Sequence, residues 1–146
     1  MRFEGTVDIR APRETVWAFL IDPMKVGSCG PGVESVEVVD ETHFKAIAKV
    51  GVGFVSARFA TSLQMAEVEP PSRAQIKAHG QAPGSAVDAT AEMRLSDGPD
   101  GSTRMDWEAD VAIAGTLASV GARLIQGTAN KLIGQTFDCI RAKLES

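Results

Sequence analysis

Few side chains in this sequence have a type and spacing that could carry out chemistry. The two histidines, His43 and His79, are isolated, and neither has a second ligand at the spacing of a metal site. Cys29 lies in a glycine-rich stretch, and a nucleophilic cysteine needs an adjacent base, which no histidine is obviously placed to supply. Cys29 and Cys139 show no metal-ligand spacing and no disulfide framework. We therefore interpret both as packing residues and predict no catalytic residue, no metal and no cofactor.

Two further patterns each have a chemical and a structural interpretation. The segment from Gly51 to Gly53 could begin a dinucleotide-binding motif, but Ser56 occupies the last glycine position and the segment joins two strands. We predict a β-hairpin turn there. The acidic alternation from Asp106 to Asp110 could suggest a row of metal ligands, but the solvated outer face of a strand has the same pattern, and we favour that interpretation.

The composition excludes several classes of protein. The chain has 146 residues, of which 44% are hydrophobic and 23% charged, and this is an ordinary globular composition. Its formal net charge is −4, whereas a nucleic-acid-binding surface needs an excess of basic residues. The N-terminus lacks the apolar segment of a secretory signal, and the most apolar stretch, Val111 to Ile125, is too short to span a bilayer. We expect a soluble, cytoplasmic protein that binds no nucleic acid.

Hydrophobic periodicity predicts the elements that must position these side chains. Alternation predicts a strand over Arg2–Arg10, and Pro12 then begins a short helix that ends at Asp22-Pro23. From Thr116 onward the apolar spacing becomes helical. Between them lie six strand-like segments separated by turn residues: Val33–Val39, His43–Val52, Phe54–Glu69, Arg73–Gln81, Ser85–Leu95 and Ser102–Ala114.

Short connectors between consecutive strands favour an antiparallel meander over a parallel sheet. The sequence therefore predicts one α+β domain over residues 1–146, a curved antiparallel sheet of about seven strands around a long C-terminal helix.

The alternation of side chains along each strand indicates which face meets the helix. Alanine is frequent in the middle of that inward face, so we expect the interior to be under-filled there and closed at one end by Trp107, Phe59 and Leu63. A helix that packs closer to the sheet and leaves no void is the alternative. The expected cavity lining is Trp17, Leu20, Cys29, Phe59, Leu63, Ile76, Ala78, Ala89, Ala91, Met93, Trp107, Ala109, Val111, Gly121, Leu124, Ile125 and Thr128.

Ionisable side chains are nearly absent from the predicted inward face. Those of the strands fall on the outward parity or at strand ends. General acid–base catalysis needs a positioned group of tuned pKa within reach of the substrate, and the sequence places none inside. The predicted cavity is therefore suited to holding a ligand and not to reacting with it.

The order of elements resembles the helix-grip fold shared by START, Bet v1 and polyketide-cyclase-like proteins of the SRPBCC superfamily. Several local strings look more specifically like the CoxG family of carbon monoxide dehydrogenase subunits. This resemblance covers nearly the whole chain. Its strings are Phe3-Glu4-Gly5, Ala11-Pro12 with Val16-Trp17-Ala18-Phe19-Leu20 and Asp22-Pro23, Pro31-Gly32-Val33-Glu34-Ser35-Val36, and Gly121-Ala122-Arg123-Leu124-Ile125-Gln126-Gly127 through Lys131-Leu132.

The resemblance implies an accessory protein of molybdenum-containing carbon monoxide dehydrogenases and related hydroxylases, and not the redox catalyst itself. Family members are thought to serve membrane recruitment or to bind a lipophilic electron carrier such as a quinone. Some relatives carry a C-terminal extension suited to membrane attachment, whereas this sequence stops at Ser146. We therefore expect any membrane contact to be peripheral, at the inner face of the membrane.

Three functional hypotheses remain. The leading one is a non-enzymatic accessory protein that holds a hydrophobic, quinone- or lipid-like molecule. The second is a cyclase or dehydratase acting in the same cavity, which an inward-pointing Glu67, His43 or Asp88 with a polar partner would support. The third is a protein-interaction or membrane-recruitment module without a ligand, which an exposed apolar patch at Val26, Val52 and Phe54 would favour.

Overall fold

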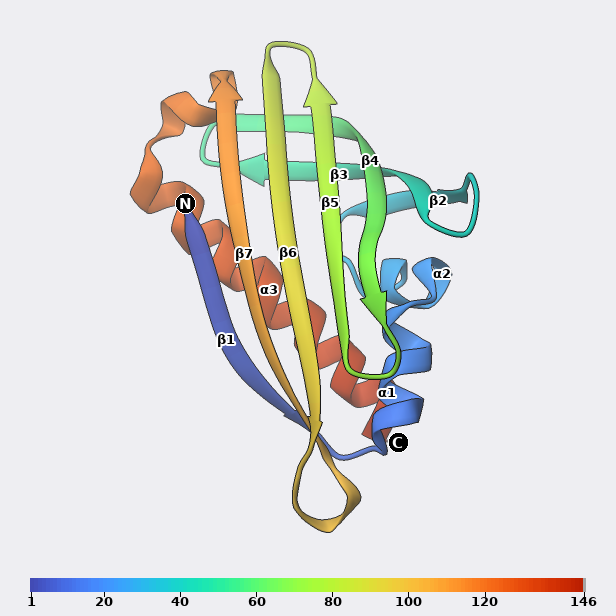
Figure 1. Cartoon of the computed structure of the whole chain (residues 1–146). Coiled ribbons are helices and arrows are strands. Elements are labelled where there is room, and N and C mark those ends of the chain that lie inside the picture. The colour runs from blue at the N-terminus through green and yellow to red at the C-terminus, as the bar shows by residue number, and fades with distance from the viewer. Residues whose placement is uncertain (146) are drawn as a thin grey trace.

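A seven-stranded antiparallel sheet curves around one long helix in this computed structural model, which describes residues 1–145 (Figure 1). The strand order is β1-β7-β6-β5-β4-β3-β2, so all neighbours except β1 and β7 are consecutive in the chain. The elements are β1 (Arg2–Ile9), α1 (Arg13–Leu20), α2 (Pro23–Gly27), β2 (Val33–Val38), β3 (His43–Val52), β4 (Val55–Glu69), β5 (Arg73–Ala82), β6 (Ser85–Asp97), η1 (Pro99–Gly101), β7 (Thr103–Gly115), η2 (Thr116–Val120) and α3 (Ala122–Glu145).

The strand order confirms the predicted antiparallel meander. The period-two alternation of apolar residues along the strands gives the sheet one inward face, which packs against α3. In Figure 1, β3 runs across the direction of β5, β6 and β7, and this curl wraps the sheet around the helix. The hairpin predicted at Gly51–Gly53 is also confirmed. Val52 pairs with Val55, and Gly53 takes the turn position with φ +59°, a conformation that favours glycine.

The C-terminal helix begins later than the periodicity predicts. Thr116–Val120 forms a 3-10 turn, and the α-helix starts only at Ala122. Between them, Gly121 has φ +97°, which a helix cannot continue through. The break lets Leu117 turn inward and become 4% exposed, so a residue that sequence spacing placed on the helix instead covers one end of the interior.

The core divides into two clusters, one at each half of α3. Phe59 belongs to the cluster that contains Leu117 and Ile125, whereas Trp107 packs against the other cluster, which contains Val16, Trp17 and Ile140. The expectation that Trp107 and Phe59 close the same end is therefore wrong. Parity fixes the face on which a strand residue lies, but it does not fix the residue's position along the helix that crosses the sheet.

Candidate ligand-binding site

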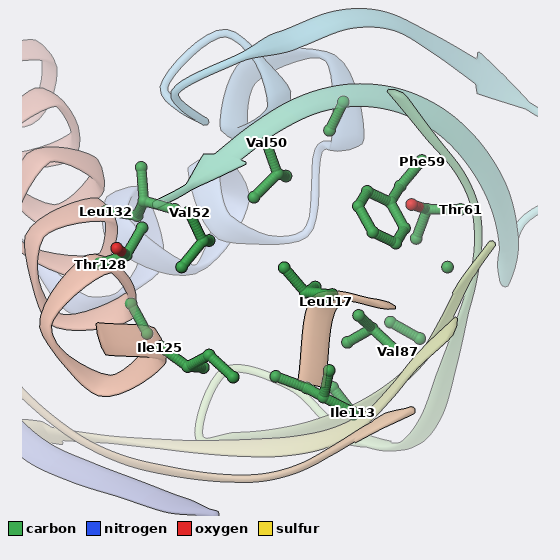
Figure 2. Close-up of a pocket in the computed structure, with 15 residues that line it drawn as sticks. Val50, Val52, Phe59, Thr61, Val87, Ile113, Leu117, Ile125, Thr128 and Leu132 are labelled. Atoms are coloured by element: carbon green, nitrogen blue, oxygen red, sulfur yellow. The ribbon is translucent and has the colours of Figure 1, made fainter. Parts of the chain in front are cut away.

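A first chamber of about 230 Å³ lies between the sheet and the N-terminal half of α3 (Figure 2). Figure 2 shows side chains from the sheet, from the 3-10 turn with Leu117, and from α3 arranged around one space. Strands β3 to β7 provide most of the wall. The lining residues are Ala48, Val50, Val52, Phe59, Thr61, Ala78, Gly80, Val87, Ala89, Ile113, Leu117, Ile125, Thr128, Ala129 and Leu132.

Small side chains in register across the sheet make room for this chamber. Ala78 of β5 pairs with Ala89 of β6, and Gly80 lies two residues further along β5, beside Thr61 of β4. A Cβ atom at Gly80 would approach Thr61 Oγ1 to 3.2 Å and the nearest Phe59 atom to 3.6 Å. The predicted alanine-rich inward face is thus present. The chamber exists because these small side chains leave unfilled the volume that larger ones would occupy.

The only polar side chains in this lining, among the residues that the structure describes, are those of Thr61 on β4 and Thr128 on α3, which lie on opposite sides of the chamber (Figure 2). Neither hydroxyl group has a hydrogen-bond partner within residues 1–145. Each can therefore donate to or accept from a polar atom of a ligand. No ionisable residue of the described chain lines the first chamber. Its chemistry is that of an apolar site with two neutral hydrogen-bonding groups.

A second chamber of about 260 Å³ lies beside the C-terminal half of α3. Trp107 and Phe137 form a tilted ring pair there, with centroids 5.5 Å apart and planes at 51°. Leu20 and Val26 close it from α1 and α2. Its other lining residues are Met65, Ala74, Gln75, Ile76, Ala91, Glu92, Met93, Met105, Glu108, Thr136 and Ile140.

The two carboxyl groups in this lining belong to an ion-pair network on the outer face of the sheet. Glu92 pairs with Arg73 and, at 2.8 Å, with Arg94, while Glu108 lies 2.6 Å from Arg2. Burial acts to raise the pKa of Glu92, but the hydrogen bond from Arg73 and the charges of Arg73 and Arg94 outweigh it and lower the pKa below its ordinary value. Glu92 is therefore held ionised and is poorly suited to donate a proton.

The structure distributes the residues predicted to line one cavity over both chambers. The first chamber contains Phe59, Ala78, Ala89, Ile125 and Thr128, and the second contains Leu20, Ile76, Ala91, Met93 and Trp107. Gly121 and Leu124 border a groove on the outside of α3, and Val111 lies at a shallow depression beside β1. Trp17, Cys29, Leu63 and Ala109 line neither chamber, and Trp17 packs in the core beside α1.

The interpretation of the cysteines as two separate packing residues is wrong. Cys29 and Cys139 form a disulfide, with Cα atoms 5.5 Å apart and a sequence separation of 110. The distance lies in the usual range for a disulfide. Sequence spacing cannot reveal this pair, because only the packing of the loop after α2 against α3 brings the two residues together.

The candidate acid–base residues lie on the surface. His43 Nδ1 is 2.9 Å from Asp40 Oδ1 in the β2–β3 turn. The pKa of Asp40 is lowered to about 2 by hydrogen bonds from the backbone N–H of Thr42, the His43 side chain and the backbone N–H of His43. Asp88 contacts His79 at 2.5 Å on the outer face of the sheet. Glu67, 60% exposed, pairs with Arg73. None of Glu67, His43 and Asp88 lines either chamber.

The exposed apolar patch at Val26, Val52 and Phe54 that would favour an interaction module does not form. Val52 is 4% exposed and lines the first chamber, and Val26 lines the second, whereas Phe54 at the tip of the β3–β4 hairpin is 80% exposed.

Several lining residues of the first chamber are missing from the site predicted from the sequence. Val87 and Ile113 share the inward parity of predicted neighbours on the same strands, so parity could have included them. Thr61 and Gly80 also lie on the inward parity, but neither is a large apolar residue, and the prediction omitted them. Leu117 belongs to the apolar spacing from which the helix was predicted, but its place in the chamber wall depends on the break at Gly121 and could not be predicted.

Two features are absent from residues 1–145. No helix there is both long enough and apolar enough to cross a bilayer. No cluster of three or more histidine, cysteine, aspartate or glutamate side chains in the same range could bind a metal ion.

Solved structures with the same architecture extend over nearly the whole chain. A conserved protein from Geobacillus kaustophilus superposes with a TM-score of 0.93 at 23% identity, covering 99% of this chain and 95% of its own. The Zhui aromatase/cyclase from Streptomyces sp. R1128 has a TM-score of 0.74 at 16% identity, with coverage of 99% and 93%. A START superfamily protein from Mycobacterium smegmatis has a TM-score of 0.71 at 14% identity, with coverage of 99% and 97%. At these identities the likeness establishes the fold alone.

Family-level comparison of the sequence is more specific than the structural likeness. Among curated proteins, no significant match was found. Residues 5–145 match the sequence profile of the family described as the CoxG subunit of carbon monoxide dehydrogenase. That match covers nearly the whole chain, and the fold is the one that START-like relatives share. The chain therefore belongs to the CoxG family of carbon monoxide dehydrogenase subunits.

Proposed function

We propose that this protein is a non-enzymatic accessory protein that binds a hydrophobic small molecule, lipid- or quinone-like, in the first chamber. The observation that carries the proposal is the chemistry of the chamber wall. Over the described residues, this wall is apolar except for the hydroxyl groups of Thr61 and Thr128 and contains no ionisable side chain. Such a wall favours burial of an apolar body and offers hydrogen bonds to one or two neutral oxygen atoms.

The size of the chamber limits what enters it. Sites for drug-sized ligands usually enclose about 300–1,000 Å³, and the first chamber has about 230 Å³ without a ligand. A single substituted ring or a short chain segment matches that volume. A quinone ring satisfies the constraint, because its carbonyl oxygens can accept hydrogen bonds from Thr61 and Thr128 while its ring contacts Phe59 and Leu117.

The partner that we propose follows from the family and not from a surface of the chain. The family description links its members to carbon monoxide dehydrogenase. We propose that the protein associates with a molybdenum-hydroxylase-type complex in the cytoplasm, with peripheral membrane contact where a lipophilic ligand is exchanged. Co-purification with such a complex tests this, and its persistence in a variant with a filled chamber would favour a recruitment module that needs no ligand.

A thermal-shift screen with short-chain quinones and fatty acids tests ligand binding. A ligand that binds only the folded state stabilises it by about 2.7 kcal/mol at one hundred times its dissociation constant. Ala89→Phe fills the first chamber and is expected to abolish the shift. The matched control is Ala112→Phe, which adds the same ring at an exposed position of the neighbouring strand. Absence of a shift with every apolar ligand would contradict the proposal.

The likeness to an aromatase/cyclase supports one alternative, an enzyme of the cyclase or dehydratase type acting in the same cavity. Such chemistry needs an acid or base that reaches the substrate. Within the described chain the first chamber has none, and the carboxyl groups beside the second are paired with arginines. Turnover of a polyketide-like substrate that Ala89→Phe abolishes would favour the enzyme over the carrier.

A further inference from the structure

The second chamber is adjacent to the first along both of its walls. On α3, Leu132 lines the first chamber and Thr136 the second, and four residues of helix span about 6 Å. On β6, Ala89 lines the first chamber and Ala91 the second, and these residues share one face at a separation of about 7 Å. A ligand held in the first chamber therefore has small side chains beside it in the direction of the second.

The lining of the second chamber suits a flexible apolar chain. Met65, Met93 and Met105 have unbranched, polarisable side chains that adapt to an irregular shape. Trp107 and Phe137 offer ring faces, and their tilted arrangement leaves both faces incompletely stacked. The carboxyl groups at this site are engaged by arginines on the outer face, so no charge here requires a charged ligand.

A disulfide joins two walls of the second chamber. Val26 of α2 lines the chamber, and Cys29 follows it by three residues. Cys139 lies on α3 between the lining residues Phe137 and Ile140. The disulfide thus joins the α2 wall to the α3 wall, and on the same side Lys143 Nζ donates to Ser28 Oγ at 2.6 Å.

The α2 segment makes few buried apolar contacts of its own. It is five residues long and contains no buried residue. Segments with few buried apolar contacts open at low free energy. Once the bond between Cys29 and Cys139 breaks, the α2 wall is held by the partly buried Val26, which packs against the core cluster, and by the hydrogen bond from Lys143 to Ser28.

We propose that the second chamber receives the apolar chain of a ligand whose polar end lies in the first, and that the Cys29–Cys139 disulfide keeps the second chamber closed. This inference rests on the proposed function. Reduction opens it by thiol–disulfide exchange with a dithiol: the bond between the two sulfurs breaks, two electrons and two protons from the dithiol convert them to thiols, and the dithiol closes to its own disulfide. The α2 wall then moves away, and the chain enters.

The test compares two probes that share one head group, a hydroquinone bearing a methyl group and the same ring bearing a decyl chain, kept free of oxygen because the corresponding benzoquinones would react with dithiothreitol and with the freed cysteine thiols. Dissociation constants are measured by calorimetry for the oxidised protein and for the protein reduced with dithiothreitol. Each methylene that becomes buried strengthens binding about fourfold. We expect the reduced protein to bind the decyl probe at least about tenfold more tightly than the oxidised protein, because at least two further methylenes enter. The methyl probe is expected to bind both forms equally.

Two variants separate the chamber from general effects of reduction. The double variant Cys29→Ser with Cys139→Ser is expected to bind the decyl probe like reduced wild type, without response to dithiothreitol. Ala91→Phe fills the second chamber and is expected to remove the advantage of the decyl chain while leaving methyl-probe binding intact. Circular dichroism confirms folding of each, and wild type in reductant supplies the same comparison if the serine variant does not fold.

The outcomes distinguish this inference from the proposed function. Equal affinity of oxidised and reduced protein for the decyl probe, with the methyl probe bound by both, would overturn the chain chamber and leave the carrier function standing. Tighter binding of the decyl probe by the oxidised form would overturn it as well. Failure of both probes to bind in either state would remove the proposed function, and this inference with it.

Discussion

The disulfide between Cys29 and Cys139 makes a large and measurable contribution to stability. It closes a loop of 110 residues, and the chain-entropy relation for such a loop gives about 5 kcal/mol as an upper value, with 2–4 kcal/mol typical of measured bonds. A chain of 146 residues has an unfolding entropy of about 0.3 kcal/mol/K near its melting temperature. Loss of 2–4 kcal/mol therefore lowers Tm by about 7–13 °C.

The assay is thermal unfolding by circular dichroism in the presence and absence of a phosphine reductant. Wild type is expected to lose stability on reduction, whereas Cys29→Ser with Cys139→Ser is expected to melt at the reduced value under both conditions. Thiol counting on the unfolded, unreduced protein supplies an independent check, with no free thiol expected. The reasoning is refuted if that count finds two thiols, or if reduction moves Tm by less than about 2 °C.

Three further substitutions test the closure of the first chamber, the buried hydrogen bond between Thr103 and Ala11, and the dependence of stability on acid pH. Leu117→Ala removes a side chain that is 4% exposed, so we expect a loss of about 2–4 kcal/mol in urea unfolding, and a loss below about 1 kcal/mol would contradict its role in closing the first chamber. Thr103→Val leaves the carbonyl of Ala11, which now accepts a 2.7 Å hydrogen bond, without that donor, and about 1–3 kcal/mol should be lost in the same assay. The pKa of Asp40 is lower in the folded chain than its ordinary 3.8, so its contribution to stability is present above pH 3.8 and lost as the pH falls towards about 2. Asp40→Asn should lack that part of the pH dependence of unfolding. An NMR titration of the Asp40 carboxyl group near 3.8 would contradict the assignment.

The strands and their order could be predicted because each depends on local information. Period-two alternation identified the strands, and short turns such as Gly53-Phe54 forced neighbouring strands to run antiparallel. The start of α3 could not be placed the same way. The apolar spacing continues through Thr116–Val120, and only the positive φ of Gly121 separates the 3-10 turn from the helix.

The candidate site was predictable only as a face and not as a volume. Parity identified Ala78, Ala89 and Ala91 as inward-facing small residues, which is where the space lies. The division into two chambers depends on how α3 crosses the curled sheet, and this placed Phe59 and Trp107 in different clusters. The disulfide escaped prediction for a related reason, since its two sulfurs meet only after the whole meander between them has formed.

The two chambers also affect how the folded state responds to a ligand. Natural interiors are close-packed, and apolar side chains that border a void lose dispersion contacts, at a free energy that grows with the volume left empty. The sheet leaves an empty volume of this kind at its small residues Ala78, Ala89 and Gly80, whereas the nearby lining residues Phe59 and Ile113 are large. An apolar molecule bound there, as we propose, would restore these contacts. A ligand of the proposed kind that fills the first chamber would therefore stabilise the folded chain through the core cluster that contains Phe59, Leu117 and Ile125.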